Sequence, residues 1–116
     1  MNLLLDTHVL LWWLDDHPAL SKPCRSAMAD GNNLVFVSAA VIWEIRIKQA
    51  LGKLKIPSTF QEILDQQPFN RLPISVEHAH VIESLPAHHR DPFDRMLVAQ
   101  AEDRRAVRPE RHVGQQ

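Results

Sequence analysis

Short strand-like runs that alternate with helical segments constrain the fold of this chain most strongly. The runs lie at Leu3–Leu5, Leu34–Val37 and Arg71–Ile74, and helical patterns separate them. Neighbouring parallel strands need such a crossover, so the alternation favours an α/β domain with a short, mostly parallel sheet. The 116 residues are enough for one compact domain and too few for two.

Start and stop signals divide the rest of the chain into predicted helices. The first three are Thr7–Leu14, a helix from an N-cap at Ser21 to near Gly31, and one capped by Ser38 that runs to about Leu51 before Gly52. The next is Thr59–Gln66, with a capping box of Ser58 and Gln61. The last two run from Ser75 through about Leu85, and from Asp91 and Pro92 through about Asp103. The pattern stops at Arg104. We therefore expect a domain over residues 1–103 and an irregular tail over 104–116.

Charge, cysteine content and apolar runs bear on the partners and the cellular compartment of this chain. The net charge of −1 neither requires nor excludes a nucleic-acid partner, because a local basic stripe can bind phosphates on a neutral protein. Cys24 is the single cysteine, so no intrachain disulfide can form, which fits a reducing cytoplasm. No apolar run is long enough for a signal peptide or a membrane span.

Asp6 is the first candidate functional residue. It directly follows the first predicted strand, and binding sites of open parallel sheets collect at the carboxyl ends of the strands. Aspartate is also favoured as the N-cap of a following helix. Position alone leaves both interpretations open.

Glu44 is harder to explain by structure alone. Its predicted helix is apolar nearly all round, and burying a carboxylate costs several kcal/mol unless it is paired or bound to a cation. Lys48, four residues later, offers a salt bridge as the structural alternative. We favour a functional role for Glu44.

Asp91 and Asp94 lie three residues apart at the start of the last predicted helix, so both point to one face. Asp91 is equally suited to cap that helix, and Asp94 suits the positive end of its dipole. The case for a functional role of Asp91 and Asp94 becomes stronger when the four acids are considered together. Four carboxylates that converge at one sheet edge repel each other unless a cation lies among them, and ligands that are all oxygen suit Mg²⁺ or Mn²⁺.

Three segments in order resemble the PIN-domain ribonucleases, in particular the VapC-type toxins of bacterial toxin–antitoxin operons. They are LLLDTHVLLWWL, VSAAVIWEIRIKQALGKL and LPAHHRDPFDRMLVAQA, spread over residues 1 to about 102. The resemblance implies a three-layer α/β/α fold and Mg²⁺- or Mn²⁺-dependent endoribonuclease cleavage, commonly of transfer or ribosomal RNA, silenced by a cognate antitoxin. It also implies a homodimer. In this family Asp6, Glu44 and Asp94 would bind the metal, and Asp91 would be an accessory catalytic acid.

The sequence departs from that family after the last helix. Similar proteins continue into a strand with a Thr-x-Asp-like motif, whereas this chain has AVRPERHVGQQ, where Glu110 is the nearest acid. We therefore expect the final strand to be missing and the site to hold one metal ion better than two. The alternative is a catalytically weak or inactive PIN-like module that binds an antitoxin.

Contacts to RNA must come from outside the acids, which repel phosphate. Arg46, Lys48, Lys53 and Lys55 lie close together in the sequence and are the candidates for backbone contacts. A solvated charged face is the structural alternative for these four residues.

Overall fold

A three-stranded parallel sheet lies at the centre of the computed structural model, which describes residues 1–85 and 91–109. The strand order is β1 (Asn2–Leu4), β2 (Leu34–Ser38) and β3 (Asn70–Leu72). The helices are α1 (Thr7–Leu14), α2 (Lys22–Ala29), α3 (Ala39–Ala50), α4 (Phe60–Asp65), α5 (Val76–Val81) and α6 (Pro92–Arg104).

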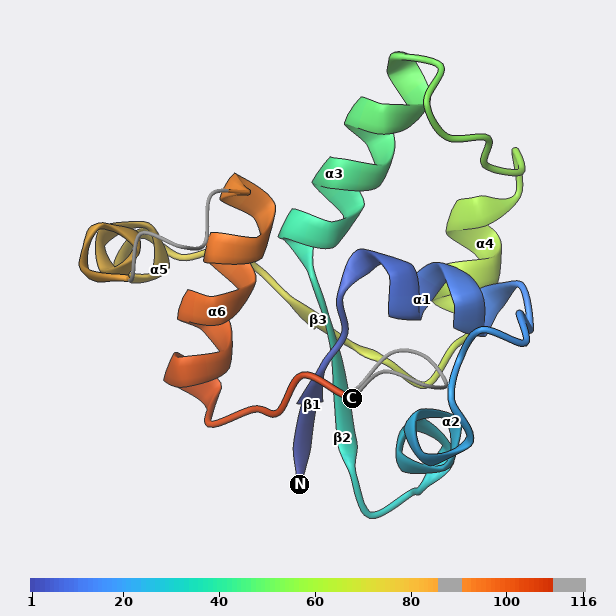
Figure 1. Ribbon diagram of the computed structural model, residues 1–116, viewed down its shortest axis with the longest axis horizontal. Coiled ribbons are helices and arrows are strands. Elements are labelled where there is room, and N and C mark those ends of the chain that lie inside the picture. The colour runs from blue at the N-terminus through green and yellow to red at the C-terminus, as the bar shows by residue number, and fades with distance from the viewer. Residues whose placement is uncertain (86–90, 110–116) are drawn as a thin grey trace.

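Helices cover both faces of this sheet (Figure 1). α5 and α6 lie on one side, α1, α2 and α4 lie on the other, and α3 extends from the end of β2 between α6 and α1. The predicted three-layer α/β/α arrangement with a parallel sheet is confirmed.

Most predicted element boundaries agree with the structure to within a few residues, and α1 agrees at both ends. β3 ends at Leu72, before the predicted end at Ile74, because Pro73 has no N–H to continue the strand pairing. The predicted capping box of α4 is wrong. Thr59 is the N-cap without a side-chain hydrogen bond, and its φ of −91° and ψ of 10° differ from the extended backbone that such a cap needs.

The last two helices differ from the prediction in small ways. α5 ends at Val81 and continues as a 3₁₀ turn over Ile82–Ser84, so the predicted single helix through Leu85 is two short pieces. α6 begins after Asp91 and ends at Arg104, one residue beyond the predicted end. Arg105 then adopts the left-handed conformation, with φ of 51°, that ends many helices.

The chain after α6 returns to the sheet for a single residue. Val107 forms a parallel bridge with Leu3, with hydrogen bonds of 2.8 Å to the carbonyl of Asn2 and 2.9 Å from the N–H of Leu4. This bridge lies on the side of β1 away from β2, so one paired residue stands where a further strand would lie. Residues 110–116, with Glu110, lie outside the described residues.

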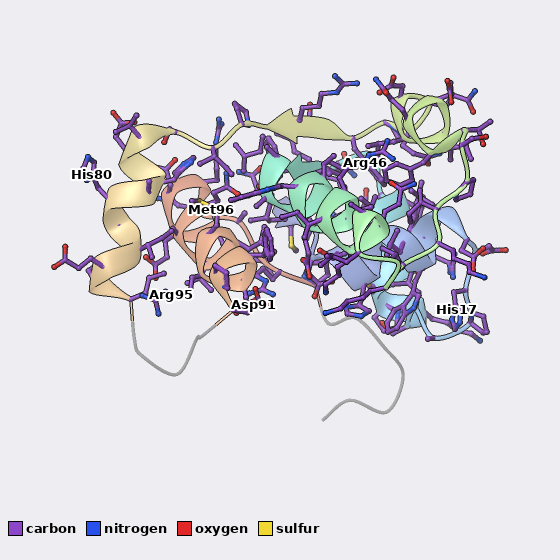
Figure 2. All side chains as sticks on the ribbon, turned by 90° about the horizontal axis from the view of Figure 1, so that it is seen from above. His17, Arg46, His80, Asp91, Arg95 and Met96 are labelled. Carbon is purple, nitrogen blue, oxygen red and sulfur yellow. The ribbon has the colours of Figure 1, made fainter. Side chains whose placement is uncertain are left out.

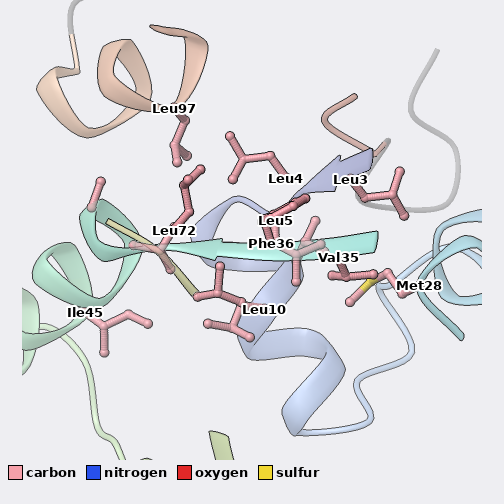
Figure 3. Packing of buried hydrophobic residues seen from close by; sticks show 14 of the residues in the cluster. Leu3, Leu4, Leu5, Leu10, Met28, Val35, Phe36, Ile45, Leu72 and Leu97 are labelled. Carbon is pink, nitrogen blue, oxygen red and sulfur yellow. The ribbon is translucent and has the colours of Figure 1, made fainter. Parts of the chain in front are cut away.

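The core fills the space on both sides of the strands (Figure 3). Leu3, Leu4 and Leu5 are at most 1% exposed, as a strand covered on both faces requires. Leu97 of α6 approaches the sheet from one side, and Leu10 of α1 lies on the other. The buried run that ends at Leu5 therefore fixes where Asp6 emerges.

A buried polar network holds α6 against the end of β2. The Ser38 hydroxyl donates to the side-chain oxygen of Gln100, and the Gln100 amide nitrogen donates to the carbonyl of Pro73 at 3.2 Å. Ser38 and Gln100 are both 0% exposed. His78 of α5 lies 3.5 Å from the same amide and contacts Asp103 at 3.0 Å. The network sets the position of the helix that begins with Asp91 and Asp94.

Within residues 1–85 and 91–109, no helix combines the length and the apolar character that crossing a bilayer demands.

Candidate active site

All four predicted acids line one cavity of about 270 Å³. They come from three parts of the chain: the turn after β1, the middle of α3 and the start of α6. Besides Asp6, Glu44, Asp91 and Asp94, the lining consists of Thr7, His8, Lys48, Leu97 and Arg108. The structure thus brings the acids together, as expected from the carboxyl ends of parallel strands.

Asp6 serves as a helix cap and still faces the cavity. Its Oδ1 accepts a hydrogen bond of 2.9 Å from the N–H of Val9, which caps α1. Its Oδ2 lies 3.9 Å from Nη2 of Arg108. The two interpretations of Asp6 are therefore compatible, because the cap uses only one carboxylate oxygen.

Glu44 is the most buried of the four acids, with 8% of its surface exposed. Its Oε1 accepts a hydrogen bond of 2.6 Å from the hydroxyl of Thr7. Its Oε2 pairs with Nζ of Lys48 at 2.6 Å, the salt bridge that was the structural alternative. Both residues line the cavity, so Lys48 neutralises Glu44 at the site itself.

The two acids of α6 differ in their surroundings. Asp91 is exposed and caps the helix by accepting from the N–H of Phe93 at 2.9 Å. Asp94 is half-buried, and its Oδ1 forms an ion pair of 2.7 Å with Nη2 of Arg108. Asp91 therefore fulfils the structural role that the sequence allowed, while Asp94 is engaged with a cation across the cavity.

Four basic residues are predicted to contact RNA, and only Lys48 of them lines the acidic cavity. Lys48 lines the acidic cavity, while Arg46 lines a separate cavity of about 650 Å³ and stacks over the Phe60 ring at 5.2 Å. Figure 2 shows Arg46 apart from Asp91 at the start of α6. Lys53 and Lys55 are exposed in the segment after α3. A contact to RNA by these residues stays a prediction.

The chemistry of the donors fits a hard divalent cation, but their present geometry does not yet form a metal cage. Carboxylate and hydroxyl oxygens line the cavity, and Mg²⁺ prefers such ligands. Within the described part of the chain, no three His, Cys, Asp or Glu side chains are placed so that they could hold an ion as they stand. Lys48 and Arg108 supply the positive charge among the acids instead.

Sequence reasoning missed three polar or charged residues of the cavity: Thr7, His8 and Arg108. Thr7 and His8 directly follow Asp6, so their adjacency to a candidate acid was the available signal. Arg108 had none, because it lies in the segment predicted to be irregular and reaches the site only through the bridge at Val107.

Comparisons with known proteins bear on this geometry. The family model described as "PIN domain" matches residues 3–108. No curated protein matches the chain. Among solved structures, the chain is similar to the crystal structure of VapBC2 from Rickettsia felis bound to a DNA fragment from their promoter, with a TM-score of 0.67. The two share 18% sequence identity, and the match covers 91% of this chain and 84% of that one, so it shows a common fold.

Proposed function

Because this chain belongs to the PIN-domain family, as the match over residues 3–108 shows, we propose that it is a metal-dependent endoribonuclease and the toxin of a toxin–antitoxin pair. The observation that carries the proposal is the convergence of Asp6, Glu44, Asp91 and Asp94 on one cavity. The structural similarity to a VapBC complex supports the toxin assignment.

The residues of the cavity would have separate roles in the reaction. Asp6, Asp94 and Glu44 would hold a Mg²⁺ or Mn²⁺ ion, which lowers the pKa of bound water and offsets charge on the attacked phosphate. Thr7 orients Glu44 through its hydroxyl, and the cap on α1 fixes Asp6. Asp91 lies at the exposed rim, where a carboxylate oxygen can accept a hydrogen bond from water.

The partners of the proposed toxin are an RNA substrate, a cognate antitoxin and a second copy of the chain. Transfer or ribosomal RNA is the expected substrate class. The similar structure is a toxin–antitoxin complex, which supports the antitoxin. A row of exposed apolar side chains along α3 and at its C-cap, at Trp43, Ile47 and Leu51, is consistent with a protein partner of either kind. We expect the chain to act in the cytoplasm.

A specific observation also favours the alternative of an inactive module. Lys48 and Arg108 neutralise the acids without a metal ion, and only one residue, Val107, pairs beyond β1 in the described part of the chain. Such a domain would bind an antitoxin and cut nothing. Metal binding alone does not separate the two functions, because an inactive domain can retain it.

Cleavage of RNA by the purified chain tests the proposal. The protein, free of antitoxin, is incubated with total cellular RNA in Mg²⁺ or Mn²⁺, with EDTA as the control. Asp6→Asn should abolish cleavage and leave the thermal midpoint unchanged or raised, because asparagine caps a helix as well as aspartate does. Asp15→Asn, at the other end of α1, is the matched control and should cut normally. Cleavage by Asp6→Asn in Mg²⁺ would show that the site is wrongly assigned. No cleavage by the unaltered chain would favour the inactive module.

A further inference from the structure

Arg108 places one nitrogen between two of the proposed metal ligands. Its Nη2 lies 2.7 Å from Oδ1 of Asp94 and 3.9 Å from Oδ2 of Asp6. The side chain is 30% exposed, so this pair is partly shielded from water. We infer that Arg108 is a built-in cation of the site, which a divalent ion must displace and which thereby sets the metal affinity. The inference rests on the proposed function.

Arg108 and a metal ion compete for these acids, because both bring positive charge to the same carboxylates. A Mg²⁺ ion bound to Asp94 lies about 2.0–2.1 Å from the carboxylate oxygen. A guanidinium nitrogen 2.7 Å from the same oxygen would then lie close to that ion, and the two positive charges would repel each other. Binding is therefore an exchange of one cation for another, and the free energy of the Arg108 ion pairs opposes it.

The backbone keeps Arg108 beside the site while its side chain remains free to leave. Val107, the preceding residue, is anchored to β1 by two hydrogen bonds. Within residues 1–85 and 91–109, both ion pairs of Arg108 use the single atom Nη2, in contrast to the two-nitrogen contact that binds a carboxylate most firmly. Rotation about the side-chain bonds can therefore open the site without moving the sheet.

This exchange has a thermodynamic consequence for metal binding. The apparent affinity of a ligand falls in proportion to the fraction of molecules in the competent state. While Arg108 occupies the space between Asp6 and Asp94, that fraction is reduced. The chain should then respond to divalent metal only above a threshold concentration that Arg108 determines.

Calorimetric titration of the full chain with Mn²⁺ tests the inference directly. Arg108→Gln removes the charge and keeps much of the side-chain length. We expect it to bind Mn²⁺ about tenfold more tightly than the unaltered chain, within the usual range of coupling between two ligands. Arg71→Gln is the matched control, because Arg71 also pairs with a carboxylate, Asp65, but lies outside the acidic cavity. Its Mn²⁺ affinity should not change.

Thermal melting supplies a second readout that does not depend on activity. In EDTA, Arg108→Gln should melt at a lower temperature than the unaltered chain, because Asp6 and Asp94 lose their shared cation. In saturating Mn²⁺ that difference should disappear or reverse. Arg108→Lys keeps a positive charge on a side chain of different shape, and its melting temperature should lie between those of Arg108→Gln and the unaltered chain. This variant keeps the test available if Arg108→Gln folds poorly.

The outcomes separate this inference from the proposed function. If the unaltered chain binds Mn²⁺ and Arg108→Gln binds it no more tightly, the proposed role of Arg108 is refuted and the proposed function is not. If the unaltered chain and every variant fail to bind Mn²⁺, the metal-dependent function is refuted and the exchange with it.

Discussion

The hydroxyl of Thr7 donates a hydrogen bond of 2.6 Å to Oε1 of Glu44, and both residues are buried. This bond joins the turn that carries Asp6 to the middle of α3, two segments more than thirty residues apart in the sequence. It therefore fixes the distance and orientation between two of the proposed metal ligands. Partners of this kind commonly change metal affinity by about 10–100-fold when they are removed.

Thr7→Val should accordingly weaken Mn²⁺ binding and RNA cleavage by about tenfold while the fold persists. Valine preserves the shape of threonine and removes only the donor to Glu44. Thr7→Ser, which restores a hydroxyl, should recover most of the affinity. Calorimetry and cleavage rates measure the effect. Unchanged metal affinity in Thr7→Val would mean that the bond to Glu44 does not position the site.

A second prediction concerns the ion pair of Glu44 with Lys48. Lys48→Ala leaves Glu44, which is 8% exposed, without the cation that now lies 2.6 Å away. Because Lys48 itself is 41% exposed, solvent screening limits the loss of unfolding free energy to about 1 kcal/mol. Urea denaturation in EDTA measures this loss.

The control for this experiment is Lys53→Ala, since Lys53 is exposed in the segment after α3. It should change the unfolding free energy by less than about 0.5 kcal/mol. Mn²⁺ should restore the stability of Lys48→Ala, because a metal ion replaces the missing charge. Equal losses in both variants would contradict a specific role for the Glu44–Lys48 pair.

The sequence predicts the strands and helices of this fold well because their signals are local. Leu3–Leu5 is apolar on both faces, and Ser38 and Ser75 cap the helices that they were expected to cap. The error at α4 has a local cause too, since a side chain that suits a cap cannot act without the extended backbone. The bridge at Val107 depends on a partner about a hundred residues away, which no local pattern encodes.

The candidate site was predictable to a different extent. A strand end and a helix start predicted the positions of Asp6, Asp91 and Asp94, whereas Glu44, in the middle of α3, was singled out by its apolar helix. The cations that neutralise these acids were harder to predict than the acids themselves. Lys48 was visible at the i+4 position, but the burial of its partner Glu44 depends on packing between α3 and α1. Arg108 reaches Asp94 only through tertiary structure.

The buried network around Gln100 yields a third prediction. Gln100→Leu removes the acceptor of the Ser38 hydroxyl and the donor to the carbonyl of Pro73, which is an exposed residue. A buried donor left unsatisfied costs about 1–3 kcal/mol, so we expect the loss of the Ser38 acceptor to lower the unfolding free energy by about that amount. Gln61→Leu, an exposed position, is the control and should lie within about 0.5 kcal/mol of the unaltered chain. A loss no larger than the control would show that the network does not hold α6.

The single cysteine supplies a fourth prediction, on the effect of alkaline pH. Cys24 is 3% exposed, and burial raises the pKa of its thiol from 9.0 to about 11, with a further contribution from the negative charge of Asp6. The folded chain thus keeps the thiol neutral where the unfolded chain ionises it. This group contributes no pH dependence well below pH 9.0, and it lowers stability progressively as the pH rises from 9.0 toward 11.

Cys24→Ala should therefore lose less stability than the unaltered chain over the same rise in pH. Urea denaturation at both ends of the interval from 9.0 to 11 measures the difference. Labelling by iodoacetamide gives an independent check, because the thiolate is the reactive form and the folded thiol remains neutral and covered. Native protein should react far more slowly than protein unfolded in urea at the same pH. Equal labelling rates in the two states would show that α2 does not bury Cys24 in solution.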